Sequence, residues 1–375
     1  LAGLEKLTSL NLWKNSIRNI TPLQNLKNLK VLDLDSNEIQ DISPLKELHK
    51  LEALRLGSNR ITDINPLANL KNLEYLCLWA NGVTDISSIG NLKKLTRLRL
   101  AYNEIKDISP VSSLNNLESI NLFSNKVSDI SPLSNLIKLK SVYLMKNEVR
   151  DIEHLNGLEN IERLRLDNNE INNIDTIKNL ENLRLLTLSK NGITDISILK
   201  DMKNIEYLDL RFNEIMDIEG LSNMDSLVKL LLDGNEIYNI MVLSNKEKLT
   251  TLSLANNNIN GLSPLKSLTK LQYLNLSDNR VKSIEPIKTL SELKKLYLDN
   301  NFIANIDPLS GNTKLTYLSL SNNYISNIDS ITKLTGLSNL NLSDNLIENI
   351  DALASNVNLT TVKLYNNRID NLTVL

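Results

Sequence analysis

The sequence predicts an α/β solenoid, a coil of short parallel strands stacked turn on turn, and three observations support this fold class. A unit of 22 residues, well represented by residues 95–116 (LTRLRLAYNEIKDISPVSSLNN), is repeated seventeen times from Leu7 without insertion or deletion. Leucine occupies the sixth position and asparagine the ninth position of every copy. All eight prolines fall at the sixteenth position. Such a fixed period is the signature of a repeat architecture.

The first nine positions of the unit predict a short strand and the turn that ends it. Positions 4 and 6 are aliphatic in the pattern L-x-L, so both side chains point to the same face of a strand. The asparagine at position 9 carries two amide donors and one carbonyl acceptor, which can satisfy backbone groups where the chain turns inward. Stacked copies would form a buried ladder of asparagines, and removing one of them should cost about 1–3 kcal/mol.

The rest of the unit predicts a return path that is too short for a full α-helix. Positions 11, 14 and 17 are aliphatic and re-enter the core. Position 13 is Asp or Asn in fifteen copies, which suits a turn whose side chain hydrogen-bonds its own backbone. Proline at position 16 can begin a short helical turn, because its missing N–H is not needed there. We therefore expect 3₁₀ turns or extended chain along this path.

Neighbouring copies must cover each other, because no single unit can bury its own leucines. With strands roughly 4.8 Å apart, the stack would span about 80 Å as a curved rod. The parallel β-sheet should lie on the concave face, and the 3₁₀ or extended segments should lie on the convex face. The repeat thus predicts a single domain over residues 1–375, where length alone would suggest two or three domains.

The unit resembles the leucine-rich repeat in its 22-residue form, most closely in residues 107–136 (DISPVSSLNNLESINLFSNKVSDISPLSNL). It is most similar to the internalin-type repeats of bacterial surface proteins, and the similarity covers the whole chain. This resemblance implies a secreted or cell-surface bacterial protein whose concave face binds a protein of a host or neighbouring cell. Ile152-Glu153 and similar pairs also resemble the repeats of a regulatory subunit of type-1 protein phosphatase. That second resemblance keeps open a cytoplasmic scaffold or regulatory subunit.

Composition argues against several other kinds of partner. The formal net charge is −2, so no global field would attract nucleic acid or a membrane surface. No segment reads as a targeting signal or a membrane span, and we expect no direct membrane insertion. Cys77 is the only cysteine, which forbids an internal disulfide and leaves the compartment undecided. Leu1 and Leu375 both occupy position 17 of the unit, so we expect a fragment whose caps lie outside it.

The sequence offers no catalytic or metal-binding constellation, and we expect neither an enzyme nor a cofactor. His49 and His154 are more than four copies apart and cannot share a site at roughly 4.8 Å per copy. His154 replaces the usual proline, which predicts a solvated turn residue. The aspartates at position 13 supply one carboxylate per turn, unlike the dense oxygen cluster of a calcium loop, so turn capping is the favoured interpretation.

Aromatic residues concentrate on one predicted surface. Positions 2, 3, 5, 7 and 8 should point outward from the strands, and twelve of the fifteen aromatic residues occupy them. Solvated rings on one face are typical of a protein-binding surface, because Trp, Tyr and Arg dominate interface hot spots. The alternative, that tyrosines simply suit strands, does not explain why both tryptophans share position 7. The densest stretch, copies 4–10, supplies the predicted partner-binding residues Tyr75, Trp79, Arg97, Arg99, Tyr102, Phe123, Tyr143, Met145, Arg163, Arg165, Tyr207, Arg211 and Phe212.

The unit is less regular around the junction of copies 11 and 12. Lys246 takes a leucine position and Gly261 takes an Asp/Asn position, while Asn312 repeats the first substitution further along. We interpret these residues as tolerated substitutions, and a hinge is the alternative. A hinge predicts faster amide hydrogen exchange in residues 238–262 than in residues 95–190, whereas uniform protection would exclude it.

Overall fold

The computed structural model describes residues 3–372, so the chain ends at Leu1 and Leu375 lie outside the described residues. It contains seventeen strands of three residues each, separated by sixteen 3₁₀ helices of three or five residues. Every pairing between strands is parallel, and no α-helix occurs within residues 3–372. The predicted solenoid, with strands on one side of each turn and 3₁₀ segments on the other, is therefore confirmed.

Contacts between Cα atoms divide the chain into two compact units that meet in sequence at Asn191 and Gly192. The division lies outside residues 238–262, the segment in which the sequence is less regular. The single domain over residues 1–375 stays a prediction.

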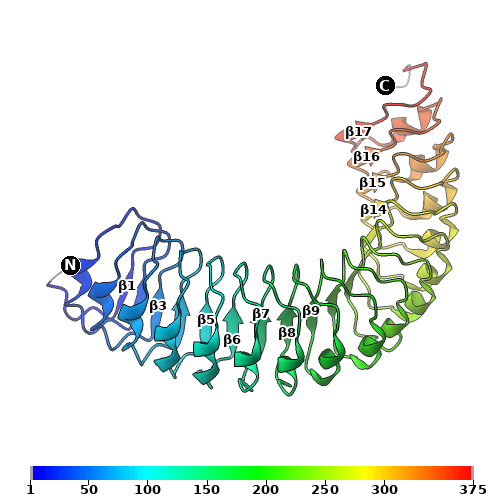
Figure 1. The fold of residues 1–375 in the computed structure, drawn as a ribbon. Helices are drawn as coiled ribbons and strands as arrows, with labels where there is room; N and C mark the ends of the chain where they lie inside the picture. Colours follow the sequence, from blue (N-terminus) through cyan, green and yellow to red (C-terminus); the bar gives the residue numbers. More distant parts are fainter. Residues whose placement is uncertain (1–2, 373–375) are drawn as a thin grey trace. The chain divides into compact units, whose positions relative to one another are not determined.

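In the first unit, nine strands pair in chain order with one constant register. Each strand residue pairs with the residue 22 positions further on, as Leu10 does with Leu32. Figure 1 shows these strands side by side, each followed by its 3₁₀ turn. The elements are β1 (Ser9–Asn11), η1 (Thr21–Leu23), β2 (Val31–Asp33), η2 (Ser43–Leu45), β3 (Ala53–Arg55), η3 (Asn65–Leu67), β4 (Tyr75–Cys77), η4 (Ser87–Asn91), β5 (Arg97–Arg99), η5 (Ser109–Ser113), β6 (Ser119–Asn121), η6 (Ser131–Leu133), β7 (Ser141–Tyr143), η7 (Glu153–Leu155), β8 (Arg163–Arg165), η8 (Asp175–Asn179) and β9 (Leu185–Thr187).

The second unit continues the same order of elements with eight strands. Its register is again constant, as in the pairing of Leu208 with Leu230. The elements are η9 (Ser197–Asp201), β10 (Tyr207–Asp209), η10 (Glu219–Leu221), β11 (Lys229–Leu231), η11 (Met241–Asn245), β12 (Thr251–Ser253), η12 (Ser263–Ser267), β13 (Tyr273–Asn275), η13 (Glu285–Thr289), β14 (Lys295–Tyr297), η14 (Asp307–Gly311), β15 (Tyr317–Ser319), η15 (Asp329–Lys333), β16 (Asn339–Asn341), η16 (Asp351–Ser355) and β17 (Thr361–Lys363).

The aliphatic columns of the unit form the core, as predicted. Leu32 and Leu34 of the second copy have no exposed surface. The corresponding residues of the first copy, Leu10 and Leu12, are only partly covered, because they have a neighbour on one side alone. The difference confirms that each copy is buried by its neighbours and not by itself.

The asparagines at position 9 form the predicted ladder, and from Asn37 onward each of them joins two copies. Asn103 donates from Nδ2 to the carbonyl oxygens of Leu100 and Ala101 in its own copy, at 3.0 and 3.3 Å. It also donates to Leu78 O of the preceding copy at 3.0 Å and accepts a hydrogen bond from the Val83 N–H at 3.1 Å. The side chain therefore replaces the backbone partners that the turn removes.

The predicted outward positions are not all strand positions. Each strand covers only positions 3–5, so positions 2, 7 and 8 lie outside it. Position 8 has a positive φ in every copy, including bulky residues such as Tyr102 at 56° and Phe212 at 56°. This left-handed conformation disfavours side chains with a Cβ. It is held by a hydrogen bond from the position 8 N–H to the next copy, as from Tyr102 N to Phe123 O at 2.7 Å.

The acidic residues at position 13 cap the turn that follows them, as predicted. Asp41 Oδ1 accepts the Ser43 N–H at 2.8 Å, and Asp41 Oδ2 accepts the Ser43 hydroxyl at 3.0 Å. The hydrogen bond from the Ser43 N–H is the main cause that holds the pKa of Asp41 below its usual value, and the bond from the Ser43 hydroxyl is the second cause. The carboxylates of this column are therefore occupied in turn formation.

Polar residues at the twentieth position, where leucine is usual, are accommodated in different ways. Lys246 is only 1% exposed, yet its amine reaches Ser222 O at 2.6 Å and the exposed carboxylate of Asp225 at 2.9 Å. Asn312 donates to two backbone carbonyls of the preceding copy, and its own Oδ1 is buried without a partner. Asn356 repeats that arrangement. These contacts fit the interpretation of tolerated substitutions.

Candidate protein-binding face

The surface formed by positions 2, 3, 5, 7 and 8 of the unit is called the strand face below. Within residues 3–372, no aromatic side chain is buried in the core, which consists of aliphatic residues with Met and Cys77. The rings of the strand face are exposed or half-buried, and Tyr102, for example, is 48% exposed. The prediction that the rings lie outside the core is therefore confirmed in both units.

Tyr75 lies at the centre of a charged cluster in the first unit. The Arg55 guanidinium lies over its ring at 5.3 Å from the centroid, and Arg99 is close enough to act on its pKa. Arg55 also donates to Asp33 Oδ2 at 3.3 Å. Burial raises the pKa of Tyr75, and the Arg99 guanidinium opposes that shift. The predicted residues Tyr75 and Arg99 thus lie close to each other on the adjacent strands β4 and β5.

Trp79 is packed more closely than a freely solvated ring would be. A Cβ on Gly57 would lie 2.1 Å from the indole, so the ring lies against the backbone of the preceding copy at a place that only glycine leaves open. Asp35 accepts the Gly57 N–H at 2.5 Å. Burial raises the pKa of Asp35, and the hydrogen bond from the Gly57 N–H opposes the shift. The tryptophan is therefore held in one position before any partner binds.

Cys77 lies between Tyr75 and Trp79 on the same copy and is covered. Burial raises the pKa of its thiol, which therefore stays protonated at neutral pH. Its position in the unit predicts that Cys77 points outward from the strand, but neighbouring side chains cover it. Cys77 is therefore not part of the accessible surface of the cluster.

Further along the first unit, two more predicted rings meet. Tyr102 and Phe123 pack edge to face with their centroids 4.7 Å apart. The Lys146 ammonium lies 5.6 Å from the Phe123 centroid. This arrangement is favourable for aromatic pairs and for a cation over a ring. The left-handed backbone at position 8 turns Tyr102 toward the next copy, where Phe123 lies.

The remaining predicted residues of the first unit are more loosely connected. Tyr143 and Arg165 are register partners on β7 and β8. Arg165 Nε is buried without a hydrogen-bond partner, and the residue as a whole is half-buried. Arg163 is exposed and lies 3.5 Å from the Glu162 carboxylate. Arg97 is exposed and Met145 half-buried.

The second unit holds three of the predicted residues, Tyr207, Arg211 and Phe212. Arg211 donates to both carboxylate oxygens of Asp209, at 2.9 and 2.6 Å, which raises the pKa of the guanidinium. The Lys229 ammonium lies 4.8 Å from the Tyr207 centroid. Phe212 lies over Gly234, where a Cβ would be 2.5 Å from the ring. Arg211 is therefore already paired with a carboxylate of its own copy.

An aromatic ladder in the second unit lies outside the predicted binding residues. Tyr273, Tyr297 and Tyr317 follow one another on β13, β14 and β15 with centroid distances of 5.4 and 4.7 Å. Burial is the main cause that raises the pKa of Tyr273 and of Tyr297. The signal was present, because tyrosines occupy position 3 or 5 in three successive copies. The predicted binding residues were confined to the arginine-rich copies 4–10, so these three tyrosines were not among them.

Aspartates at position 7 form a second set of contacts that sequence reasoning missed. Asp167 Oδ1 accepts the backbone N–H and the hydroxyl of Ser189 in the next copy, at 3.1 and 2.8 Å. Asp299 makes the same pair of contacts with Ser321, at 2.8 and 2.6 Å. An Asp at position 7 followed by Ser at position 7 of the next copy is the sequence signal. These carboxylates stabilise the face and are not free to bind a partner.

The histidines and carboxylates show no arrangement typical of a metal centre. His49 contacts Glu47 at 3.1 Å, and His154 lies 3.8 Å from Glu153, each in a partly exposed turn. Among residues 3–372, no group of three or more His, Cys, Asp or Glu side chains could hold a metal ion. The same part of the chain has no helix with the length and hydropathy needed to cross a bilayer.

The repeated strands, the asparagine ladder and the exposed rings define a solenoid repeat protein. The chain belongs to the leucine-rich repeat family. A family model described as a leucine-rich repeat region matches residues 6–247, and a model of two leucine-rich repeats matches residues 247–289, 269–311, 291–334 and 313–355. No curated protein matches the chain. Leucine-rich repeat families are typically non-enzymatic modules that act in protein–protein recognition.

Solved structures confirm the internalin-type fold. An internalin of Listeria monocytogenes is 32% identical over 92% of this chain and 88% of its own, with a TM-score of 0.61. A leucine-rich repeat protein of Leptospira interrogans is 28% identical over 92% of both chains, with a TM-score of 0.85. The Arabidopsis receptor kinase HAESA, solved with the peptide hormone IDA and a co-receptor, is 24% identical over 97% of this chain and 67% of its own. Its TM-score of 0.82 is a likeness of fold.

Proposed function

We propose that this chain is the protein-recognition module of a bacterial surface or secreted internalin-like protein and that it binds a protein partner through its strand face. The observation that carries the proposal is the placement of the aromatic residues, which concentrate on this face and are absent from the described core. The likeness to an internalin of Listeria monocytogenes supports the cellular context. We propose a host or neighbouring-cell surface protein as the partner.

The first unit contains the part of the face that is best prepared for binding. Trp79 is packed against Gly57, and the Arg55 guanidinium lies over the ring of Tyr75. Side chains that are already ordered lose little conformational entropy on binding, so more of the contact energy appears as affinity. Trp, Tyr and Arg are also the residue types that dominate interface hot spots.

The chemistry of the partner follows from the groups that remain exposed. Arg97, Arg99 and Arg163 have exposed side chains on this face. Arginine pairs with carboxylates through two parallel hydrogen bonds and also stacks on aromatic rings. The proposed partner therefore presents acidic and apolar side chains together, with the acidic groups opposite β5 and β8.

Equilibrium binding of the fluorescently labelled chain to cultured host cells and to bacterial cells tests the proposal. Trp79→Ala and Arg99→Ala should each cost about 2 kcal/mol, or roughly a 30-fold higher half-saturating concentration. Tyr324→Ala is the matched control, because Tyr324 is an exposed ring at position 10, off the strand face. Circular dichroism should give the same spectrum for all variants. Equal binding by the parent and both strand-face variants would move the site to another surface.

The alternative is a cytoplasmic scaffold or regulatory subunit that holds another protein through the same face. The two locations are distinguished by the full-length gene and by cell fractionation. A secretion signal preceding this segment, with the protein recovered at the cell surface or in the medium, supports the surface proposal. Recovery of the full-length protein in the cytoplasm supports the alternative.

A further inference from the structure

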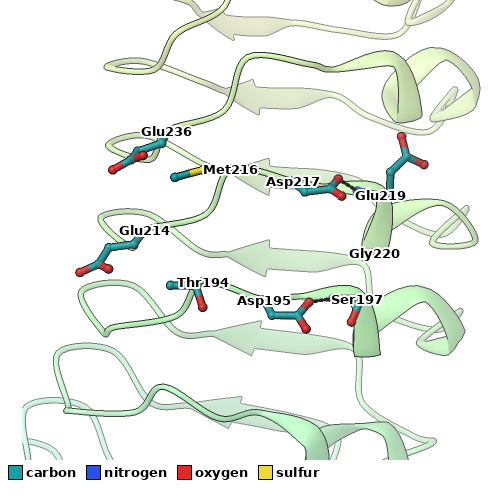
Figure 2. Close-up of a pocket in the computed structure, with 9 residues that line it drawn as sticks. All are labelled: Thr194, Asp195, Ser197, Glu214, Met216, Asp217, Glu219, Gly220 and Glu236. Carbon is teal, nitrogen blue, oxygen red and sulfur yellow. Dashed lines mark hydrogen bonds between the residues drawn. The ribbon is translucent and has the colours of Figure 1, made fainter.

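A groove of about 380 Å³ lies in the second unit, away from the strand face. Its walls come from positions 10–16 of neighbouring copies, the segment that leads from the end of a strand to the next 3₁₀ helix. Figure 2 shows its side chains on three successive turns. The residues that line it are Thr194, Asp195, Ser197, Glu214, Met216, Asp217, Glu219, Gly220 and Glu236.

All the charged residues that line the groove are acidic. Five of its nine lining residues are acidic and none is basic. Asp195 and Asp217 accept backbone N–H groups at 2.8 Å and cap the 3₁₀ helices η9 and η10. Glu214 and Glu236 occupy the same position of adjacent copies and extend into solvent at the opposite end of the groove from these caps (Figure 2). A ligand along the groove would therefore meet negative charge at both ends.

Exposed apolar side chains lie in and beside the groove. Met216 is 54% exposed and lines it, while Tyr238 and Met241 on the next copy are 64% and 57% exposed. Position 12 of the unit holds a large apolar residue only at Met216 and Tyr238, and elsewhere it is small, polar or charged. Exposed apolar patches with polar rims mark interaction sites. Methionine and tyrosine are also enriched at protein interfaces.

Gly220 allows two neighbouring copies to approach closely at the groove. A Cβ at this position would lie 2.0 Å from Ile196 O, so η10 packs directly on the backbone of the preceding copy. In eight other copies the same position is a proline. The groove therefore coincides with a local departure from the repeat in two columns, at positions 12 and 16.

We infer that this groove binds a basic segment of a partner protein, one that carries lysine or arginine beside apolar residues, as a second interaction site separate from the strand face. A compact metal ion does not fit, because the carboxylates are distributed over successive copies and no metal-binding group occurs among residues 3–372. Lysine and arginine side chains do fit. Their aliphatic stems can lie along Met216 and Thr194 while the charged ends reach Glu214 and Glu236.

The test uses the full chain and a fluorescein-labelled lysine–leucine peptide, with binding measured by fluorescence anisotropy at low and at physiological salt. Glu214→Gln with Glu236→Gln should weaken binding about five-fold, the effect of two exposed ion pairs. Met216→Ser should weaken it about five-fold at both salt concentrations, because the contact it removes is apolar. A glutamate–leucine peptide should not bind, and the strand-face variant Trp79→Ala should bind like the parent.

A matched control separates this site from general attraction by negative charge. Glu148→Gln with Glu170→Gln makes the same change in net charge at position 10 of two other copies, where position 12 holds no apolar residue. It should change the affinity less than two-fold. An equal loss in both double variants, equal binding of the glutamate–leucine peptide, or no binding of the lysine–leucine peptide at millimolar concentration would each overturn the inference.

Discussion

Replacing Asn103 by alanine removes four hydrogen bonds, but the four backbone groups that lose them are affected to different degrees. The carbonyl oxygens of Leu78 and Leu100 keep a second donor, because Asn81 and Asn125 of the same ladder also donate to them. The Val83 N–H has no such substitute, since Asn103 Oδ1 is its acceptor. Alanine therefore leaves one buried donor without a partner and weakens three other contacts.

The magnitude follows from that inventory. A buried donor without a partner costs about 1–3 kcal/mol, and a carbonyl that retains one of its two donors loses much less. We expect Asn103→Ala to lower the free energy of unfolding by about 3 kcal/mol. The Val83 amide should then exchange with solvent hydrogen roughly 100-fold faster, because each 1.36 kcal/mol corresponds to a factor of ten.

The same ladder contains its own control. Asn15 donates only within its own copy, to Leu12 O and Trp13 O at 3.0 and 3.3 Å, and both contacts are exposed. Asn15→Ala should therefore cost less than about 1 kcal/mol. Urea denaturation gives the stabilities, and native-state hydrogen exchange gives the local effect at Val83. Equal losses in the two variants would refute the argument that the ladder acts by joining neighbouring copies.

Three further predictions concern other parts of the repeat. Lys246→Leu should leave the free energy of unfolding unchanged or raise it by up to about 2 kcal/mol, because a well-packed apolar residue replaces a buried ammonium group that pairs with an exposed carboxylate. A lower urea midpoint would contradict this. Gly57→Ala should displace the Trp79 ring and shift its fluorescence to the red in a Trp13→Phe background, whereas Gly261→Ala, with no atom within 4 Å of its Cβ, should not. Acid should destabilise the parent more than a variant in which the four capping aspartates with a lowered pKa are changed to Asn. Because backbone N–H groups lower their folded pKa values, these caps contribute fully above the unfolded value of about 3.9 and are lost as pH falls through the lower folded values. Equal urea midpoints against pH in the two proteins would contradict this. Those aspartates are Asp41, Asp85, Asp129 and Asp195.

The fold could be predicted from the sequence because each structural role is tied to one residue type at one position. Leucine at position 6 and asparagine at position 9 occur in every copy, and the constant period determines the strand register without further information. The left-handed backbone at position 8 has only a partial signal in the sequence. Asn, Asp or Gly, which adopt this conformation readily, occupy it in eight copies, but Lys14, Tyr102 and Phe212 occupy it too and are not typical of it. The requirement comes from the hydrogen bond to the following copy.

The candidate site was predictable as a surface but not as a set of contacts. The repeat positions placed the rings outside the core, and the structure confirms that placement. How closely each ring is packed depends on the residues of neighbouring copies. Trp79, for example, packs against the backbone of the preceding copy because Gly57 has no Cβ. Similarly, Arg211 is neutralised by Asp209 two residues earlier. Such pairings depend on rotamers that a single-sequence pattern does not specify.

The constant register has a consequence for how such a chain can change in length. Because the asparagine of each copy bonds the same positions of the preceding copy, removing or duplicating a stretch of 22 residues leaves all remaining partners in place. A deletion of 21 residues would instead leave one extra residue in the copy at the junction, which that copy would have to accommodate as a bulge. Gene recombination between copies can therefore change the number of copies between the aromatic cluster and the acidic groove in whole-unit steps, without redesigning either surface.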